Sequence, residues 1–423
     1  MCNNYKALRG VAMTVAMAAT LSLSLWGQTY HVIHNFNLST GDGAAPSAGL
    51  AFDSHGNLFG TTFAGGTPNG CGAGYTCGTV FELSPDGSGG WNERVIYNLT
   101  SVDAHPGAPV TLDSHGNIYG TGGGFNGLGG VFALLLGTNG SYTPEILHQF
   151  RGNGDGAYPG SGLTLDSASG FLYGTTSEGG EYNDGTVYSV NPHSVAGLSV
   201  LHSFTPNITS GNSPSSTYLQ LINGSIYGTT LSGGPGGAFG DGTIFQLTHS
   251  ASGWTATTLY TFKGPAHGDG ARPVPGLLAD GAGNFFGVTS TGGTACAPTG
   301  CGTVFKLSHN ADGSWTESIL HSFQNGLDGN FPWGNLVFDG SGNIYGTTYA
   351  GGMLHSYGAG TVFKLTPAAG GQWTYSVVVR LPGGAGGSTI DGGVVIDSAG
   401  NIYGTAQSDG AYGDGVAFEI TPQ

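Results

Sequence analysis

The residues in this sequence best suited to bind a cation are aspartates in a recurring motif, Asp-Gly-x-x-Pro. The complete copies begin at Asp42, Asp155, Asp269 and Asp328, and weaker forms begin at Asp103 and Asp391. Aspartate in this context is first a turn signal, because its carboxylate accepts hydrogen bonds from nearby backbone amides. A ring of such carboxylates could also hold Ca²⁺, which prefers several oxygen ligands. The chain has no Asp-x-Asp-x-Asp spacing, so we favour the turn and keep these aspartates as candidate metal ligands.

Four histidines share one repeat position, at which tyrosine stands in two other copies: His34, His148, His202 and His321, with Tyr97 and Tyr260 as the replacements. A catalytic base would not alternate with tyrosine, so we interpret these histidines as structural. The sequence contains no Gly-x-Ser-x-Gly elbow, no His-Glu-x-x-His helix and no phosphate loop. Sites can also be assembled from scattered loops, so the missing motifs leave catalysis open.

Aromatic residues in the loops between repeated segments differ from copy to copy, and this variation suits ligand recognition. The candidates for a ligand-binding face are Tyr158, Tyr182, Arg272, Phe331, Trp333 and Tyr357. Exposed rings on one face can stack on sugars or grip another protein. They could equally serve as lids over the ends of the strands.

The elements that must position these residues are repeats built around Gly56-Asn57-Leu58-Phe59-Gly60-Thr61-Thr62. Six further copies follow, and their second glycines recur every 54 to 60 residues. Self-similarity at this period indicates a repeat architecture. Glycine within a strand is costly, so we expect a close approach of a neighbouring blade or backbone at these positions, with the recurrent aromatic residues packed between repeats.

Each repeat reads as four short antiparallel strands, rich in β-branched and aromatic residues and divided by Gly, Pro, Asn and Asp. Seven such units predict an all-β fold, a seven-bladed β-propeller of four-stranded antiparallel blades. A β-solenoid would need shorter coils, and a string of separate sandwiches would need a larger core in each unit.

The last repeat ends at Gln423 without its fourth strand, whereas residues 28–37 match the fourth strands of other repeats. We therefore predict that this N-terminal strand pairs in the last blade and closes the ring, which leaves no open edge between the first and last blades. Residues 28–423 then form a single propeller domain.

Residues 1–27 resemble a secretory leader, because Lys6 and Arg9 precede an apolar run from Val11 to Trp26. We expect a secreted bacterial protein, extracellular or periplasmic, whose mature chain has no membrane-inserted segment and acts as a monomer. The net charge of −16 argues against nucleic acid or an acidic membrane face as a partner.

Four cysteines form two near pairs in equivalent loops, Cys71 with Cys77 and Cys296 with Cys301. In an oxidising compartment such pairs predict local disulfides, which we favour over a metal site because no histidine recurs beside them.

The pattern Asp-x-x-Gly-Asn-x-Tyr-Gly-Thr-Thr, followed by Gly-Gly and Gly-Thr-Val-Phe-x-Leu, resembles the bacterial GloVer tandem repeat of secreted choice-of-anchor proteins. Its best copies lie at 53–83, 280–307 and 339–365. The resemblance implies a secreted or surface propeller-like protein and brings no catalytic residues with it.

These observations favour a binding or interaction module, for extracellular glycans or for surface proteins, that needs no cofactor except, in the weaker interpretation, calcium. The alternative is a propeller enzyme, a polysaccharide lyase or hydrolase, with its site on the face that carries the long loops.

Overall fold

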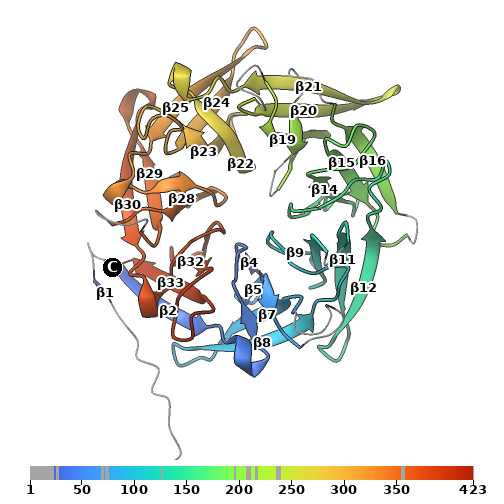
Figure 1. The fold of residues 1–423 in the computed structure, drawn as a ribbon, viewed down its shortest axis with the longest axis vertical. Helices are drawn as coiled ribbons and strands as arrows, with labels where there is room; N and C mark the ends of the chain where they lie inside the picture. Colours follow the sequence, from blue (N-terminus) through green and yellow to red (C-terminus); the bar gives the residue numbers. More distant parts are fainter. Residues whose placement is uncertain are drawn as a thin grey trace, which may run out of the picture.

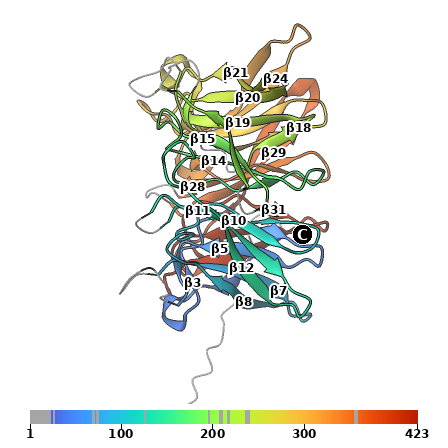
Figure 2. The same ribbon diagram turned by 90° about the vertical axis from the view of Figure 1, so that its right-hand side faces the viewer.

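Seven antiparallel sheets stand around a central axis in the computed structural model, as Figure 1 shows down that axis and Figure 2 from the side. The model describes residues 23–24, 28–67, 71, 76–124, 127–194, 197–205, 211–214, 218–234, 240–353 and 358–422. The predicted all-β, seven-bladed propeller is confirmed. In this part of the chain the only helical segments are 3-10 turns, at Leu38–Thr40, Pro265–His267, Gly326–Asp328, Ala369–Gly371 and Gly384–Gly386.

The first four blades follow the order of the repeats. Blade 1 comprises β4 (Ala51–Phe52), β5 (Leu58–Thr62), β7 (Thr79–Pro85) and β8 (Trp91–Asn98), with the small pair β3 (Gly43–Ala44) and β6 (Ala64–Gly65) beside it. Blade 2 comprises β9 (Thr111–Leu112), β10 (Ile118–Gly122), β11 (Gly130–Leu136) and β12 (Tyr142–Gln149). Blade 3 comprises β13 (Thr164–Leu165), β14 (Leu172–Thr176), β15 (Thr186–Val190) and β16 (Leu198–Ser203). Blade 4 comprises β17 (Asn212–Pro214), β18 (Gln220–Ile222), β19 (Ser225–Ser232), β20 (Thr243–Ser250) and β21 (Gly253–Thr261).

The other three blades complete the ring. Blade 5 comprises β22 (Gly270–Ala279), β23 (Phe285–Gly292), β24 (Thr303–His309) and β25 (Trp315–Ser322). Blade 6 comprises β26 (Asn330–Pro332), β27 (Val337–Phe338), β28 (Ile344–Ala350), β29 (Thr361–Pro367) and β30 (Trp373–Arg380). Blade 7 comprises β31 (Val395–Ile396), β32 (Ile402–Ala406), β33 (Val416–Pro422) and the N-terminal strand β2 (Gln28–Asn35), flanked by β1 (Leu23–Ser24).

The N-terminal strand closes the ring, as the sequence predicts. β2 pairs with β33 from Gln28–Pro422 to Asn35–Val416, which places the blue and red ends of the chain in one sheet (Figure 1). Tyr30 is buried, and its hydroxyl donates a hydrogen bond to the Gly386 carbonyl at 2.6 Å. One blade thus contains both ends of the described chain.

The repeated glycine lies beneath an aromatic ring of the same blade, and not against a neighbouring blade or backbone as we expected. Gly60 pairs across the sheet with Phe81, and a Cβ at Gly60 would lie 2.4 Å from Phe81 Cζ. The equivalent glycines are covered in the same way, for example Gly346 by Phe363. The aromatic rings themselves form the core, as predicted, since Phe81 and Phe363 are fully buried.

The two threonines after this glycine have separate structural roles. The first reaches the next blade near the axis, as when Thr405 Oγ1 donates to the Ala48 carbonyl at 2.8 Å and joins blade 7 to blade 1. The second bonds within its blade, as between the Thr348 and Thr361 hydroxyls at 2.8 Å. Packing and hydrogen bonding therefore explain why the glycine and the threonines recur in the repeats.

Both predicted disulfides are present, Cys71–Cys77 and Cys296–Cys301, with Cα atoms 5.8 and 5.5 Å apart. The proposed leader, residues 1–27, lies outside the described residues except for Leu23 and Ser24, which form β1 beside β2. Within the described ranges, no helix is long and apolar enough to cross a membrane.

Candidate functional site

Three of the four recurrent histidines meet motif aspartates at the junctions between blades, whereas no motif aspartate follows His202 in the sequence. The Nε2 atom of His34 lies 2.9 Å from Asp42 Oδ2, and His148–Asp155 and His321–Asp328 repeat the contact at 3.1 Å. Tyr260 makes the equivalent bond, its hydroxyl donating to Asp269 Oδ2 at 2.8 Å. Alternation of histidine with tyrosine is thereby explained, because either side chain can donate to the carboxylate.

The same aspartates also accept backbone hydrogen bonds, as the turn interpretation requires. Asp269 Oδ2 accepts from the Lys263 amide at 2.9 Å, and Asp328 Oδ2 from the Gln324 amide at 2.8 Å. These bonds hold the connection between the outermost strand of one blade and the innermost strand of the next. No ring of converging carboxylates results, since each of these aspartates bonds within its own junction.

In the connection that enters each blade, one residue adopts a left-handed backbone, and the seven equivalents form a ring. In the four complete motif copies it lies three positions after the aspartate, whereas Asp391 of the weaker form lies two positions beyond its blade's equivalent, Thr389, and so does not occupy the motif position. We call this set the loop ring: Ala45, His105, Tyr158, Ser213, Arg272, Phe331 and Thr389, with φ between 50° and 67°. Positive φ is uncommon for residues with a side chain, and such strain persists only where the surroundings impose it. Here the repeat imposes it seven times.

Two contacts to the preceding blade impose this conformation. The amide of each loop-ring residue donates to a carbonyl in that blade's loop before its third strand, as from Tyr158 to Leu128 and from Phe331 to Cys301. In most blades a proline follows and packs on the glycine just before the third strand, and a Cβ at Gly129 would lie 2.5 Å from Pro159 Cδ; after Thr389, Ile390 takes the place of the proline. The side chains of the loop ring are left partly or fully exposed. A rigid frame therefore presents seven variable side chains.

The predicted ligand-face residues fall at distinct places relative to this ring. Tyr158, Arg272 and Phe331 belong to it, and Tyr158 is 40% exposed. Tyr182 lies in the loop between β14 and β15 and is 47% exposed. Trp333, two residues beyond Phe331, lines the central channel, whereas Tyr357 lies outside the described residues.

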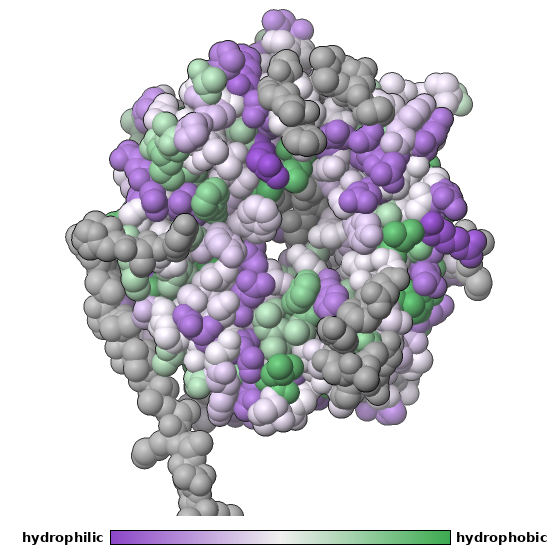
Figure 3. All heavy atoms as spheres, in the orientation of Figure 1, coloured by the Kyte–Doolittle hydropathy of each residue, from purple (hydrophilic) through white to green (hydrophobic). Residues whose placement is uncertain are grey.

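A small pocket with a mixed apolar and polar lining occupies the mouth of the central channel on this face. Its volume is about 270 Å³, close to the lower end of small-molecule pockets, at about 300 Å³, and all seven blades line it. The polar and aromatic lining comprises Ser47, Ser161, Ser177, Ser213, Trp333, Asn335 and Asp391. Figure 3 looks onto this face and shows a narrow opening at the centre of the ring.

The electrostatics of the pocket are set by one carboxylate. Burial raises the pKa of Asp391 from 3.8 to about 6, and among the described lining residues it is the single acidic group. Ser47 Oγ is buried without a hydrogen-bond partner in the described structure. Trp333 contributes a large ring that is 43% exposed. The pocket can thus offer hydrogen bonds, one weakly acidic group and an aromatic surface to a small polar ligand.

Part of this site was predictable from the sequence, and part was not. Arg272, Tyr158 and Phe331 were selected as loop residues, but their equivalence was not recognised. Their shared place directly before the motif proline was the available signal. Ser47 and Asn335 gave no such signal, because only the closing of the ring brings seven separate segments to one axis.

Several solved propellers are similar in structure at low sequence identity. An ancestral GH74 enzyme matches with a TM-score of 0.52 at 11% identity, over 93% of this chain and 53% of that one. The periplasmic gluconolactonase of Pseudomonas aeruginosa matches with a TM-score of 0.48 at 16% identity, over 83% and 91% of the two chains. The PQQ domain of pyranose dehydrogenase from Coprinopsis cinerea matches with a TM-score of 0.44 at 10% identity, over 95% and 97%. At 11% identity the likeness to the ancestral GH74 enzyme shows the fold alone.

A search of curated proteins finds no significant match to this sequence. The repeat itself is recognised: the family model of the Gloeobacter/Verrucomicrobia repeat matches residues 13–238 and 224–423. These two segments include every blade described above. The protein is thus a member of the Gloeobacter/Verrucomicrobia repeat family, as the resemblance in its glycine-centred motif predicts.

Proposed function

We propose that this protein is a binding propeller that captures a sugar unit of an extracellular glycan at the mouth of its central channel. The observation that carries the proposal is Trp333, an exposed indole beside a small pocket lined by serine hydroxyls and an asparagine amide. Sugars present apolar faces that stack on aromatic rings and hydroxyls that bond to such groups. The loop ring would contact the units on either side.

The net charge of −16 favours a neutral or cationic glycan over an acidic one. The two disulfides support an encounter outside the cytoplasm. Calcium is not needed for this mode of binding, because the ligand contacts come from hydroxyl, amide and aromatic groups.

Glycan-array screening followed by calorimetry tests the proposal. We expect Trp333→Ala to weaken binding of the selected glycan by about 1–3 kcal/mol, and Trp333→Phe to retain part of the affinity. Tyr412→Ala is the matched control, since Tyr412 is 57% exposed and does not line the channel pocket. Equal losses in the Trp333 and Tyr412 variants, or unaltered binding in Trp333→Ala, would reject the channel mouth as the site.

The raised pKa of Asp391 favours one alternative, a polysaccharide lyase or hydrolase in which this carboxyl group serves as a general acid or base. Product release from a polysaccharide that disappears in Asp391→Asn, while glycan binding persists, would support the enzyme. Binding without turnover by the wild-type protein supports the binding module.

A further inference from the structure

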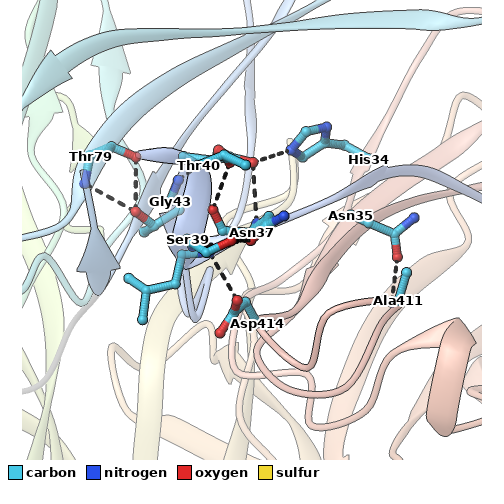
Figure 4. A network of polar contacts seen from close by, with 12 residues as sticks. His34, Asn35, Asn37, Ser39, Thr40, Gly43, Thr79, Ala411 and Asp414 are labelled. Carbon is cyan, nitrogen blue, oxygen red and sulfur yellow. Dashed lines mark hydrogen bonds and ion pairs between the residues drawn. The ribbon is translucent and has the colours of Figure 1, made fainter. Parts of the chain in front are cut away.

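One blade junction differs chemically from the other six, and it lies at the seam where the ring closes. His34 on β2, Asp42 in the connection to blade 1 and Glu93 on β8 each offer one ligand atom, and these atoms lie within 4.8 Å of one another. Figure 4 shows the same seam, with His34, Asn37 and Asp414 around the connection from β2 into blade 1. All three side chains of the cluster are partly buried.

The position of Glu93 explains why this junction is unusual. Glu93 lies opposite Leu83 in the sheet, and from this position its side chain reaches the junction that precedes blade 1. Tyr375 and Tyr30 fill the place in blades 6 and 7, where their hydroxyls donate to the Asp328 and Gly386 carbonyls. Glu93 has no such hydroxyl, and its Oε1 atom is buried without a hydrogen-bond partner.

Among the described residues, no other junction offers the same three groups; residues 206–210, in the connection between blades 3 and 4, lie outside them. In blade 5 the residue equivalent to Glu93 is Glu317, but at the junction before that blade Tyr260 replaces the histidine. The junction with His321 has Tyr375, and the junction with His148 has Leu198. The remaining blades carry Pro144, Ala256 and Tyr30 in this place. Histidine, aspartate and glutamate coincide once.

We propose that His34, Asp42 and Glu93 bind a divalent transition-metal ion, Zn²⁺ above all, that ties the closing strand to the first blade. Imidazole and carboxylate are normal zinc ligands at about 2.0–2.2 Å. His34 Nε2 and Asp42 Oδ2 lie 2.9 Å apart, at hydrogen-bond distance, so a bound ion would replace this hydrogen bond after small movements of the two side chains. Water completes the coordination, and the side chains of His34 and Asp42 retain 20% and 12% exposure for entry.

The surroundings favour a cation at this place. Two carboxylates, Asp42 and Glu93, stand beside a single imidazole in the cluster, so a bound cation would balance their negative charge. Asp42 Oδ1 accepts the Gly43 amide at 2.6 Å, which fixes the orientation of the carboxylate. Such outer contacts orient metal ligands. Calcium is a poorer occupant, because it selects oxygen ligands and the histidine supplies nitrogen.

The experiment titrates zinc into the metal-free full-length protein against a coloured chelator. We expect one ion per chain in the wild type, and affinity at least about tenfold weaker in Glu93→Gln and in His34→Tyr. His34→Tyr recreates the junction that Tyr260 forms naturally, and Glu93→Gln is nearly isosteric, so circular dichroism should show both variants folded. Glu317→Gln is the matched control and should bind zinc as the wild type does.

Thermal unfolding gives a second readout, because an ion bound only to the folded state stabilises it. Zinc should raise the melting temperature of the wild type and of Glu317→Gln, but not that of Glu93→Gln. Absence of saturable zinc binding in the wild type, or equal affinity in all four proteins, would overturn the proposal. Competition by Ca²⁺ at matched concentration would overturn the choice of a transition metal.

Discussion

At the scale of single residues, the glycine of each repeat is fixed by one ring. The aromatic residue across the sheet covers it so closely that no side chain fits between the two, as at Gly346 beneath Phe363. Glycine normally weakens a strand, but here it is required because the ring leaves no space for a side chain. From the sequence we expected crowding by a neighbouring blade or backbone, but the contact is a side-chain ring of the same blade.

A single methyl group should therefore be costly at this position. In Gly346→Ala the Cβ would lie 2.5 Å from Phe363 Cζ and 2.7 Å from Leu336 Cδ2, so we expect a loss of about 1–3 kcal/mol in the free energy of unfolding. Urea denaturation measures this loss. Gly340→Ala in the same blade is the control, because a Cβ there meets nothing within 4 Å. A loss as large in the control as in Gly346→Ala would contradict the explanation.

At the scale of elements, β2 is the strand on which the ring depends. It supplies the outer strand of blade 7 and buries Tyr30, and the segment that follows bonds back to that blade through Leu38 N and Asp414 Oδ2 at 2.9 Å. Without it, β33 would present an unpaired edge. β2 also carries His34, whose side chain contacts Asp42 in the connection to blade 1.

Deletion of residues 28–37 should lower the melting temperature of the whole domain and reduce the cooperativity of its unfolding. Calorimetry measures both quantities. A peptide with the sequence of residues 28–37, added in excess, should restore part of the loss, because it can pair with β33. The substitution Tyr30→Ala should lower the free energy of unfolding by about 3–5 kcal/mol, because it removes the buried ring that β2 contributes to the core. Unfolding that is unchanged by the deletion would show that β2 is dispensable.

At the scale of the whole molecule, stability should depend on pH through a carboxyl group at a blade junction. Burial, and then the charge of Asp269, raises the pKa of Glu317 from 4.5 to about 8, while Lys263 opposes the shift. Between pH 4.5 and about 8, Glu317 is therefore protonated in the folded protein but ionised in the unfolded chain. The stabilisation is therefore present at low pH and declines as pH rises toward 8.

We expect the wild-type melting temperature to fall between pH 5 and pH 8.5 more steeply than that of Glu317→Gln. The difference corresponds to on the order of 2 kcal/mol after a discount for solvent screening, since this side chain is partly exposed. Differential scanning calorimetry at both pH values provides the test. Parallel pH profiles would show that Glu317 ionises normally in the folded protein.

The sequence by itself determined the blade count, the four strands of each blade, the closure by residues 28–37 and both disulfides. These features follow from local chemistry repeated along the chain: turn residues, strand propensity and paired cysteines. The tertiary structure alone decided what lies beside what, because the decisive contacts join different repeats. It placed the motif aspartates against His34 and its equivalents, put Tyr158, Arg272 and Phe331 in one ring, and drew Ser47, Trp333 and Asp391 together around the axis. Periodicity fixes the number of blades, but only closure of the circle sets the distances across it.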